Sequence, residues 1–107
     1  MFEIKQKESG ESFHFVLKAK NGQVILSSQS YASKAGALNG AESVKKNGTN
    51  DDLFERKIAK NGKFYFNLKA TNGQIIGTSQ MYSGESGMEN GISSIKTNAP
   101  IAEIKEI

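Results

Sequence analysis

One segment of this sequence occurs twice. Residues 13–31 read FHFVLKAKNGQVILSSQSY, and residues 64–82, which lie 51 positions later, read FYFNLKATNGQIIGTSQMY. The similarity continues through matched glycine, asparagine, serine and lysine positions beyond each segment. A duplication of this kind predicts a chain built from two copies of one supersecondary unit, at about 1–50 and 51–107.

The length allows one hydrophobic core. The chain of 107 residues is long enough for a single compact domain, residues 1–107, but too short for two independent ones. Hydrophobic residues make up 36% of it and charged residues 23%, which is typical of an ordered, soluble, globular protein. No apolar run reaches the roughly 20 residues that a membrane-spanning helix needs, and the first residues lack the pattern of an export signal. We therefore expect a cytoplasmic protein without membrane contact.

The excess of basic residues is small and lies in the first copy. The net charge is +3, and residues 1–50 contain seven lysines and four glutamates, whereas residues 51–107 contain seven basic and seven acidic side chains. This charge is compatible with a polyanionic partner. Arg56, however, is the only arginine, and arginine is the usual bidentate ligand of phosphate and guanine. The composition thus permits nucleic-acid binding without requiring it.

The first copy begins with two strands. Residues 2–7 alternate between apolar and polar side chains, as residues 13–20 do. Ser9-Gly10 lies between them and supplies a tight turn. A two-residue loop at this point places the apolar residues of both strands on one face.

The next turn sets the register of a third strand. Asn21-Gly22 predicts a two-residue type I′ hairpin turn, because both residues accept positive φ at low cost. The resulting pairing places Val24 on the buried face and Ile25 on the opposite face. The matching turn of the second copy places Ile75 on the buried face and Ile76 on the opposite one.

The first turn of the second copy has two interpretations. A two-residue turn at Asn61-Gly62 would direct Lys57 and Ala59 to the buried face. A three-residue turn with a bulge would instead direct Phe54 and Ile58 there, which burial favours. We therefore expect the three-residue turn.

Each copy ends in a helix. Ser33 is expected to be the N-cap of a helix over residues 34–46, and Asn47-Gly48 to end it by left-handed capping. Both helices have one apolar face at the spacing i, i+4, i+7. The residues on these faces are Ala37, Ala41 and Val44 in the first copy and Met88, Ile92 and Ile95 in the second.

Both helices also contain glycine at matched positions. These are Gly36 and Gly40 in the first copy and Gly87 and Gly91 in the second. A glycine inside a helix costs about 1 kcal/mol relative to alanine. Its presence at four matched positions indicates that another group packs close to each helix backbone.

The order of elements predicts an α+β domain. A last strand over Ile101–Ile107 is expected to pair with an edge of the sheet, which gives the order βββα-βββα-β. Two βββα repeats would pack as one antiparallel sheet with both helices on one side. Since neither copy can bury a core alone, we expect pseudo-twofold symmetry between them.

The repeated residues also resemble a known family. The pattern LKAxNGQxI, followed by SQxY, NG and SxKxN, occurs once in each copy. It closely resembles the YegP-like family of small bacterial proteins, whose domain has no assigned function and often occurs as a tandem repeat. The resemblance covers nearly the whole chain and implies intertwined repeats, in which strands of one copy complete the sheet of the other. The first helix starts with Ser33-Lys34-Ala35-Gly36, as in the family, but the second has Ser83-Gly84-Glu85-Ser86, so a role that needs both lysines is not implied.

Residue types that carry catalysis are scarce. His14 is the only histidine and is replaced by Tyr65 at the matching position, and the only aspartates, Asp51-Asp52, are interpreted as loop solvation. No serine lies in a nucleophile-elbow motif, and no spacing of ligands predicts a metal or cofactor site. We therefore expect no enzyme and no bound cofactor.

A mixed basic and aromatic set is expected on the sheet face away from the helices. The set consists of His14, Lys18, Lys20, Ile25, Tyr65, Lys69 and Ile76. Basic and aromatic side chains on an exposed sheet can bind single-stranded nucleic acid, although an ordinary solvated face accounts for most of the same residues. The two isoleucines indicate that the other copy, a second chain or a ligand covers this face.

The sequence therefore predicts a non-enzymatic interaction module. The candidate partner is a polyanion such as single-stranded nucleic acid, and the duplication favours a monomer while leaving a dimer open. The alternative is a small enzyme or binder acting on a polar metabolite. That alternative predicts a pocket with His14 or Tyr65 beside a lysine of perturbed pKa.

Overall fold

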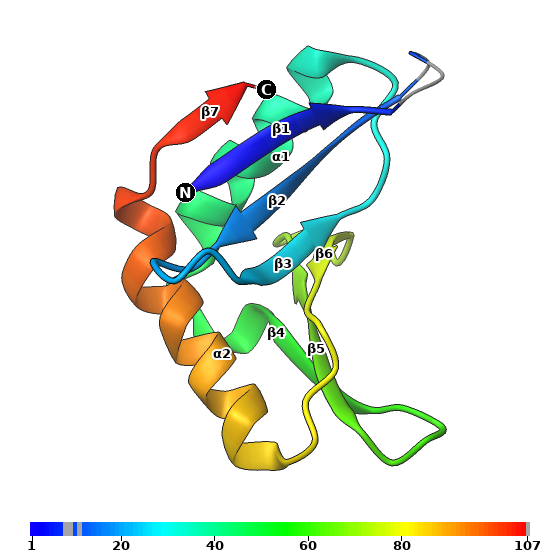
Figure 1. Ribbon diagram of the computed structural model, residues 1–107, viewed down its shortest axis with the longest axis vertical. Coiled ribbons are helices and arrows are strands. Elements are labelled where there is room, and N and C mark those ends of the chain that lie inside the picture. The colour runs from blue at the N-terminus through cyan, green and yellow to red at the C-terminus, as the bar shows by residue number, and fades with distance from the viewer. Residues whose placement is uncertain (8–9, 11, 107) are drawn as a thin grey trace.

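The computed structural model describes residues 1–7, 10 and 12–106. The predicted order βββα-βββα-β is confirmed, with a short 3₁₀ turn after each helix (Figure 1). The elements are β1 (Phe2–Gln6), β2 (Phe13–Lys18), β3 (Val24–Ser28), α1 (Lys34–Asn47), η1 (Asp51–Leu53), β4 (Phe54–Ile58), β5 (Phe64–Lys69), β6 (Ile75–Thr78), α2 (Glu85–Asn98), η2 (Ala99–Ile101) and β7 (Ile104–Glu106).

The strands form one sheet in the order β4-β5-β6-β3-β2-β1-β7. All neighbours are antiparallel except β7, which lies parallel to β1. The sheet is therefore mostly antiparallel, as predicted, but it is mixed because of the one parallel pair at its edge. The predicted pairing of the last strand with an edge is confirmed, but Ala99–Ile101 forms η2 around Pro100, so the strand is shorter than predicted.

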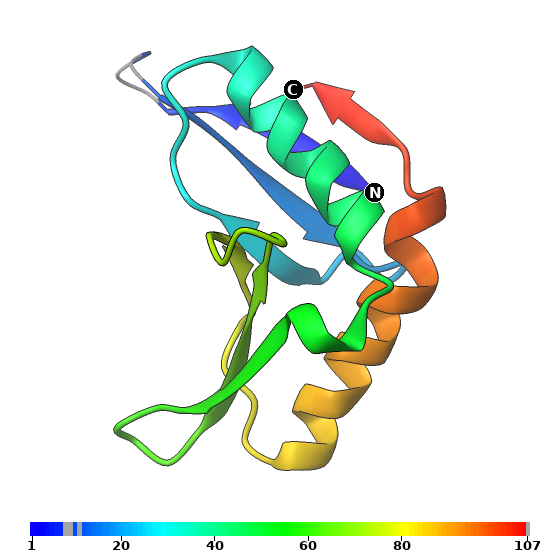
Figure 2. The ribbon, with the colours of Figure 1, turned by 180° about the vertical axis from the view of Figure 1, so that it is seen from behind.

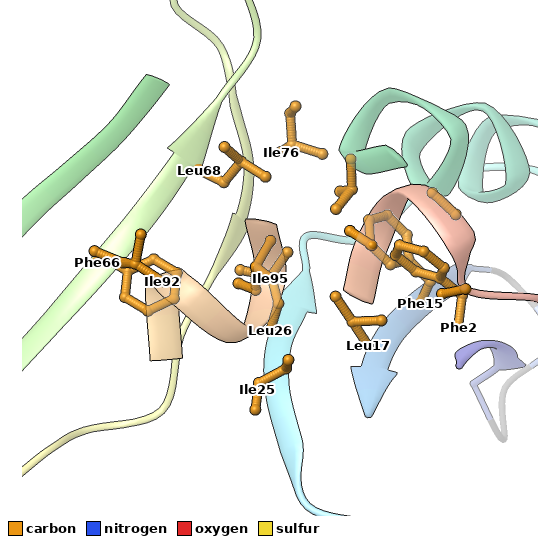
Figure 3. Packing of buried hydrophobic residues seen from close by; sticks show 14 of the residues in the cluster. Phe2, Phe15, Leu17, Ile25, Leu26, Phe66, Leu68, Ile76, Ile92 and Ile95 are labelled. Atoms are coloured by element: carbon orange, nitrogen blue, oxygen red, sulfur yellow. The ribbon is translucent and has the colours of Figure 1, made fainter. Parts of the chain in front are cut away.

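One hydrophobic core joins the two copies. In Figure 2 α1 crosses in front of β1 and β2, while α2 packs against β5. The buried cluster contains the predicted apolar faces of both helices. Figure 3 shows that the cluster runs without interruption from Phe66 and Ile92, through Ile95 and Leu26, to Phe15.

The start of α1 forms as predicted. Ser33 is its N-cap, and the Ser33 Oγ accepts a hydrogen bond of 3.0 Å from the backbone N–H of Gly36. The predicted left-handed end at Gly48 is wrong, because Gly48 has a φ of −67°. A Cβ on Gly48 would lie 2.6 Å from the carbonyl oxygen of Val44 and 3.2 Å from Ile95. The position needs glycine for close helix packing and not for its φ angle.

Tyrosine rings pack against the matched helix glycines. A Cβ on Gly40 would lie 2.3 Å from the hydroxyl oxygen of Tyr31, and a Cβ on Gly91 would lie 2.3 Å from that of Tyr82. The expected close approach to both helix backbones is thus confirmed. Burial raises the pKa of Tyr31.

The hairpin turns contain three residues. Gly22 donates to the carbonyl of Ala19, Ala19 donates to the carbonyl of Gln23, and Gly22 has a φ of +84°. No other residue type has positive φ in the described part of the chain, so the predicted type I′ turn is wrong. The three-residue turn predicted at Asn61-Gly62 is confirmed by the same bonds from Ala59 and Gly62.

The strands on either side of the Asn61-Gly62 turn follow the prediction only in part. Phe54 pairs with Leu68 and is buried, as expected. Ile58 pairs with Phe64 but is 68% exposed, because it lies near the end of the hairpin, beyond the core. The turn predicted at Ser9-Gly10 lies partly outside the described residues.

In each copy a bulge reverses the predicted orientations of two neighbouring side chains in the third strand. Leu17 pairs with Leu26 and Lys18 with Val24, so Ile25 is an additional residue in β3. A bulge of this kind directs two successive side chains to the same side, and Ile25 joins the core at 5% exposure.

The second copy has the same irregularity. Lys69 pairs with Ile75, so Ile76 is the additional residue, and it is buried in the core while Ile75 is 39% exposed. The prediction that Ile25 and Ile76 lie on the face away from the helices is therefore wrong. The extra turn residue and the bulge together shift the alternation of each strand.

Candidate binding face

The sheet side opposite the helices is here called the outer face. It consists of the strand residues that alternate away from the core. One row of these residues crosses all seven strands through directly paired positions. From β7 to β4 the row contains Lys105, Glu3, Val16, Ser27, Thr78, Asn67 and Glu55.

The outer face has a first half, formed by β1, β2 and β3, and a second half, formed by β4, β5 and β6. Each half carries a glutamate between two lysines. Glu3 lies 3.1 Å from the Nζ of Lys18 and 3.8 Å from that of Lys5. Glu55 lies 2.9 Å from the Nζ of Lys69 and 3.9 Å from that of Lys57. The four strands that hold these groups, β1, β2, β4 and β5, place them in matching positions.

The second half contains an additional polar chain. Thr78 Oγ1 donates to Asn67 Oδ1 over 2.7 Å, and Asn67 Nδ2 donates to Glu55 Oε1 over 3.1 Å. The hydrogen bond from Lys69, followed by that from Asn67, lowers the pKa of Glu55. In the first half Val16 occupies the place of Asn67. A valine side chain forms no hydrogen bonds, so it cannot connect the neighbouring polar residues to Glu3.

The net charge of the protein lies on the outer face. Its strand residues include two glutamates and five lysines, and the nine other basic residues of the sequence balance the nine other acidic ones. The five lysines are Lys5, Lys18, Lys57, Lys69 and Lys105. Counting along the sequence assigned the excess to the first copy, whereas the fold spreads it over both halves of one face.

The structure brings together four of the seven residues predicted from sequence. His14, Lys18, Tyr65 and Lys69 lie on the outer face, with His14 paired to Lys5 and Tyr65 paired to Lys57. Lys20 lies in the turn between β2 and β3 and is exposed. Ile25 and Ile76 belong to the core, as described above. His14 Nδ1 is buried without a hydrogen-bond partner among the described residues.

The two glutamates and three of the lysines were missed. For four of these five residues the signal was a Glu-x-Lys pattern in both copies, Glu3-Ile4-Lys5 and Glu55-Arg56-Lys57, and the fifth is Lys105 in β7. These two patterns are 52 positions apart and not 51, because the loop before β2 is one residue longer than the loop before β5. A fixed 51-residue spacing therefore did not align them.

A second charged cluster connects η1 and β4 to α2. Arg56 donates to both carboxylate oxygens of Glu89, over 2.6 and 3.0 Å, and over 3.0 Å to Asp51, which Lys96 also contacts. The hydrogen bond from Lys96, followed by that from Arg56, lowers the pKa of Asp51, and Arg56 lowers that of Glu89. The interpretation of Asp51-Asp52 as loop solvation missed these ion pairs of Asp51.

Two pockets lie where a turn of one copy meets the helix end of the other. The first, of about 490 Å³, is lined by Ala19 and Lys20 of the first copy and Asn98 of the second. The second, of about 460 Å³, is lined by the matching Ala70 and Thr71 together with Asn47. Neither pocket is lined by His14 or Tyr65.

Two absences concern the described residues alone. Among residues 1–7, 10 and 12–106, no three His, Cys, Asp or Glu side chains gather as a metal site would require. None of the helices found there has the length and apolar character needed to cross a membrane.

Comparison with known proteins gives one family. The family described as "Domain of unknown function (DUF1508)" matches this chain twice, over residues 8–55 and 59–106. A UPF0339 protein from the ptx operon 5′ region of Stutzerimonas stutzeri is 52% identical over 106 residues, which are 99% of this chain and 95% of that protein. UPF0339 protein YegP of Escherichia coli K12 is 50% identical over 105 residues, 98% of this chain and 94% of its own length.

Two solution NMR structures share the fold. One is a UPF0339 protein from Shewanella oneidensis, with a TM-score of 0.91, 48% identity and coverage of 98% of this chain and 88% of that one. The other is the protein of unknown function yegP from Escherichia coli, with the same TM-score and identity and coverage of 98% and 90%.

Proposed function

This chain belongs to the DUF1508 family of unknown function, with UPF0339 and YegP proteins of bacteria as relatives, and we propose that it is a non-enzymatic interaction module whose outer face binds single-stranded nucleic acid. The predicted YegP-like resemblance and tandem repeat are confirmed by these matches. The relatives are named without an activity, so the proposal depends on the surface of this chain.

The placement of the net charge carries the proposal. The five lysines and two glutamates of the outer face give it an excess of three positive charges, and the rest of the chain has none. A basic stripe on one face is the electrostatic footprint expected of a nucleic-acid-binding protein. Across the sheet, Lys18 in β2 and Lys69 in β5 are three strand spacings apart, about 14 Å. Each also lies two residues beyond the paired row, in opposite directions along the strands, so an extended polyanion that crosses the sheet diagonally can reach both.

Two rings on the same face favour a single strand over a duplex. His14 and Tyr65 occupy matching positions of β2 and β5, and both are partly exposed. Aromatic side chains on a sheet stack with unpaired bases, and each stacked base contributes about 1–3 kcal/mol. Between the halves the outer face carries the small polar residues Ser27 and Thr78, which leave a path for the backbone of the nucleic acid.

A salt series with labelled oligonucleotides tests the proposal. We expect fluorescence anisotropy to detect binding of oligo(dT) and oligo(U) that weakens steeply with salt. The double variant Lys18→Gln/Lys69→Gln should reduce the slope of log affinity against log salt by about 1.4, since each lost phosphate contact contributes about 0.7 on a single strand. Lys46→Gln/Lys60→Gln, which removes the same charge from exposed positions outside the outer face, should leave the slope unchanged. The absence of binding at micromolar protein in low salt would overturn the proposal.

The alternative, a small enzyme acting on a polar metabolite, has less support. It requires His14 or Tyr65 in a pocket, and neither lines the two pockets described above. The interaction module therefore remains the preferred function. An activity that depends on His14 would reverse this preference.

We also infer that the two copies are intertwined and related by a pseudo-twofold axis. Ser27 pairs with Thr78, its own counterpart 51 positions later, which is the arrangement an axis at this point requires. Each pocket combines a turn of one copy with the helix end of the other. The cytoplasmic location and the monomeric state expected from the sequence remain part of this proposal, and sedimentation of the full chain tests the latter.

A further inference from the structure

The larger pocket has an apolar rim that is open to solvent. Ile101 is 78% exposed and Met1 is 44% exposed, and both line this pocket together with Ala19 and Ala102. Exposed apolar side chains that gather at one concave site indicate a binding site more often than scattered ones do. The volume of about 490 Å³ lies in the range of pockets for small ligands.

The pocket contains a basic side chain that is free to bind an anion. Lys18, Lys20 and Glu3 line it, and Glu3 forms an ion pair of 3.1 Å with Lys18. Lys20 is exposed and has no ion pair among the described residues. The amino group of Met1 also lies at this pocket and donates to the carbonyl of Lys18 over 3.0 Å. A negatively charged ligand therefore matches the site.

The matching pocket of the second copy lacks the apolar rim and the lysine of the turn, and its basic residue, Lys46, comes from α1 together with Glu42. Thr71 takes the place of Lys20, and the sequence counterpart of Ile101, 51 positions earlier, is Asn50. The duplication thus kept the turn and the helix end that form each pocket but changed the lining. An apolar rim with a lysine in the adjoining turn, present at one copy alone, is not required by the fold.

We propose that this pocket binds a small aliphatic monocarboxylate. The ammonium group of Lys20 binds the carboxylate, and Ile101, Met1 and Ala102 contact the alkyl chain. The pocket borders the outer face, because Glu3 and Lys18 line it, but the two residues tested below, Lys20 and Ile101, lie outside the strand rows of that face. The two proposals can therefore fail independently.

Titration of the ¹⁵N-labelled full chain with octanoate tests the site. We expect saturable amide shifts at Ala19, Lys20, Asn98 and Ala102, and weaker binding of octanol and octylamine, which lack the negative charge. Lys20→Gln should weaken octanoate binding about fivefold, as the loss of one exposed ion pair does. Ile101→Ser should weaken it about tenfold through lost apolar contact.

The chain supplies a matched control for the lysine. Lys60 occupies the same place in the turn Ala59-Lys60-Asn61-Gly62 as Lys20 does in its own turn, but it does not line the pocket. Lys60→Gln should therefore leave octanoate affinity unchanged, and the amide spectrum of each variant shows whether it is folded. The proposal is overturned if octanoate gives no saturable shifts, if octanol binds equally well, or if Lys20→Gln and Lys60→Gln have the same effect.

Discussion

The side chain of Leu26 fills the space beside Gly77. A Cβ on Gly77 would lie 2.9 Å from the Cγ of Leu26 and 3.0 Å from the carbonyl oxygen of Ser27. These two residues are counterparts in the duplication, 51 positions apart, and they meet where β3 pairs with β6. Only one of the two positions can hold a large side chain, so the copies had to differ at this point.

Exchange of these two residues should preserve the fold. Gly77→Leu alone should destabilise the protein by about 1–3 kcal/mol through overpacking, and Leu26→Gly alone by more than about 3 kcal/mol through a cavity and a flexible strand. The double variant Leu26→Gly/Gly77→Leu should recover most of this loss if the copies are related by a twofold axis. Urea unfolding of all four proteins measures the coupling, and strictly additive losses would contradict the symmetry.

The tyrosine packing predicts opposite effects at two glycines of one helix. Gly91→Ala should destabilise by about 1–2 kcal/mol, because the new Cβ would lie 2.3 Å from the Tyr82 hydroxyl. Gly87→Ala should be neutral or stabilising, because its nearest neighbour is at 3.4 Å and alanine favours the helix by about 1 kcal/mol. Thermal unfolding distinguishes the two, and equal melting temperatures would contradict the close packing.

The bulge predicts a contrast between two adjacent isoleucines. Ile76→Ala should cost about 2–4 kcal/mol, because Ile76 is buried in the core. Ile75→Ala should cost less than about 1 kcal/mol, because Ile75 is 39% exposed opposite Lys69. Denaturant unfolding of both variants checks this. A larger loss of stability for Ile75→Ala than for Ile76→Ala would instead support the strict alternation expected without a bulge.

One shared core predicts matched damage in the two helices. Ala41→Lys and Ile92→Lys should each cost several kcal/mol, because both positions are buried on the apolar face of their helix. Leu38→Lys, on the exposed side of α1, should have little effect. Each variant should unfold in a single transition. Loss of one half with the other half intact would show two separate cores.

The cluster around Arg56 predicts an acid-dependent contribution to stability. The pKa values of Asp51 and Glu89 are lowered in the folded protein, so their contribution is present above the unfolded values, near 4, and is lost as the pH falls below them. Arg56→Gln should therefore reduce stability at pH 7 and have much less effect at pH 3. The pKa of Glu55 is also lowered, but Glu55 is present in both the original protein and the Arg56→Gln variant, so it does not affect the difference in stability between them. Urea unfolding at both pH values tests this, with Lys60→Gln as control, and an equal loss at both would exclude the cluster as the cause.

The sequence by itself determined the features that depend on neighbours along the chain. The duplication, the order of elements, the Ser33 cap and the apolar helix faces are local patterns of composition and spacing. The close approach to the helix glycines was also predictable, because glycine in a helix is costly unless space requires it.

Tertiary structure decided which side chains share a face and which strands share an edge. One bulged residue, Ile25, reverses the alternation that its sequence predicts, because strand register depends on long-range backbone pairing and not on periodicity alone. The parallel pairing of β7 with β1 and the fit of Leu26 against Gly77 likewise join residues far apart in the chain. For the same reason the net charge, spread along the sequence, is gathered on one face only by the sheet.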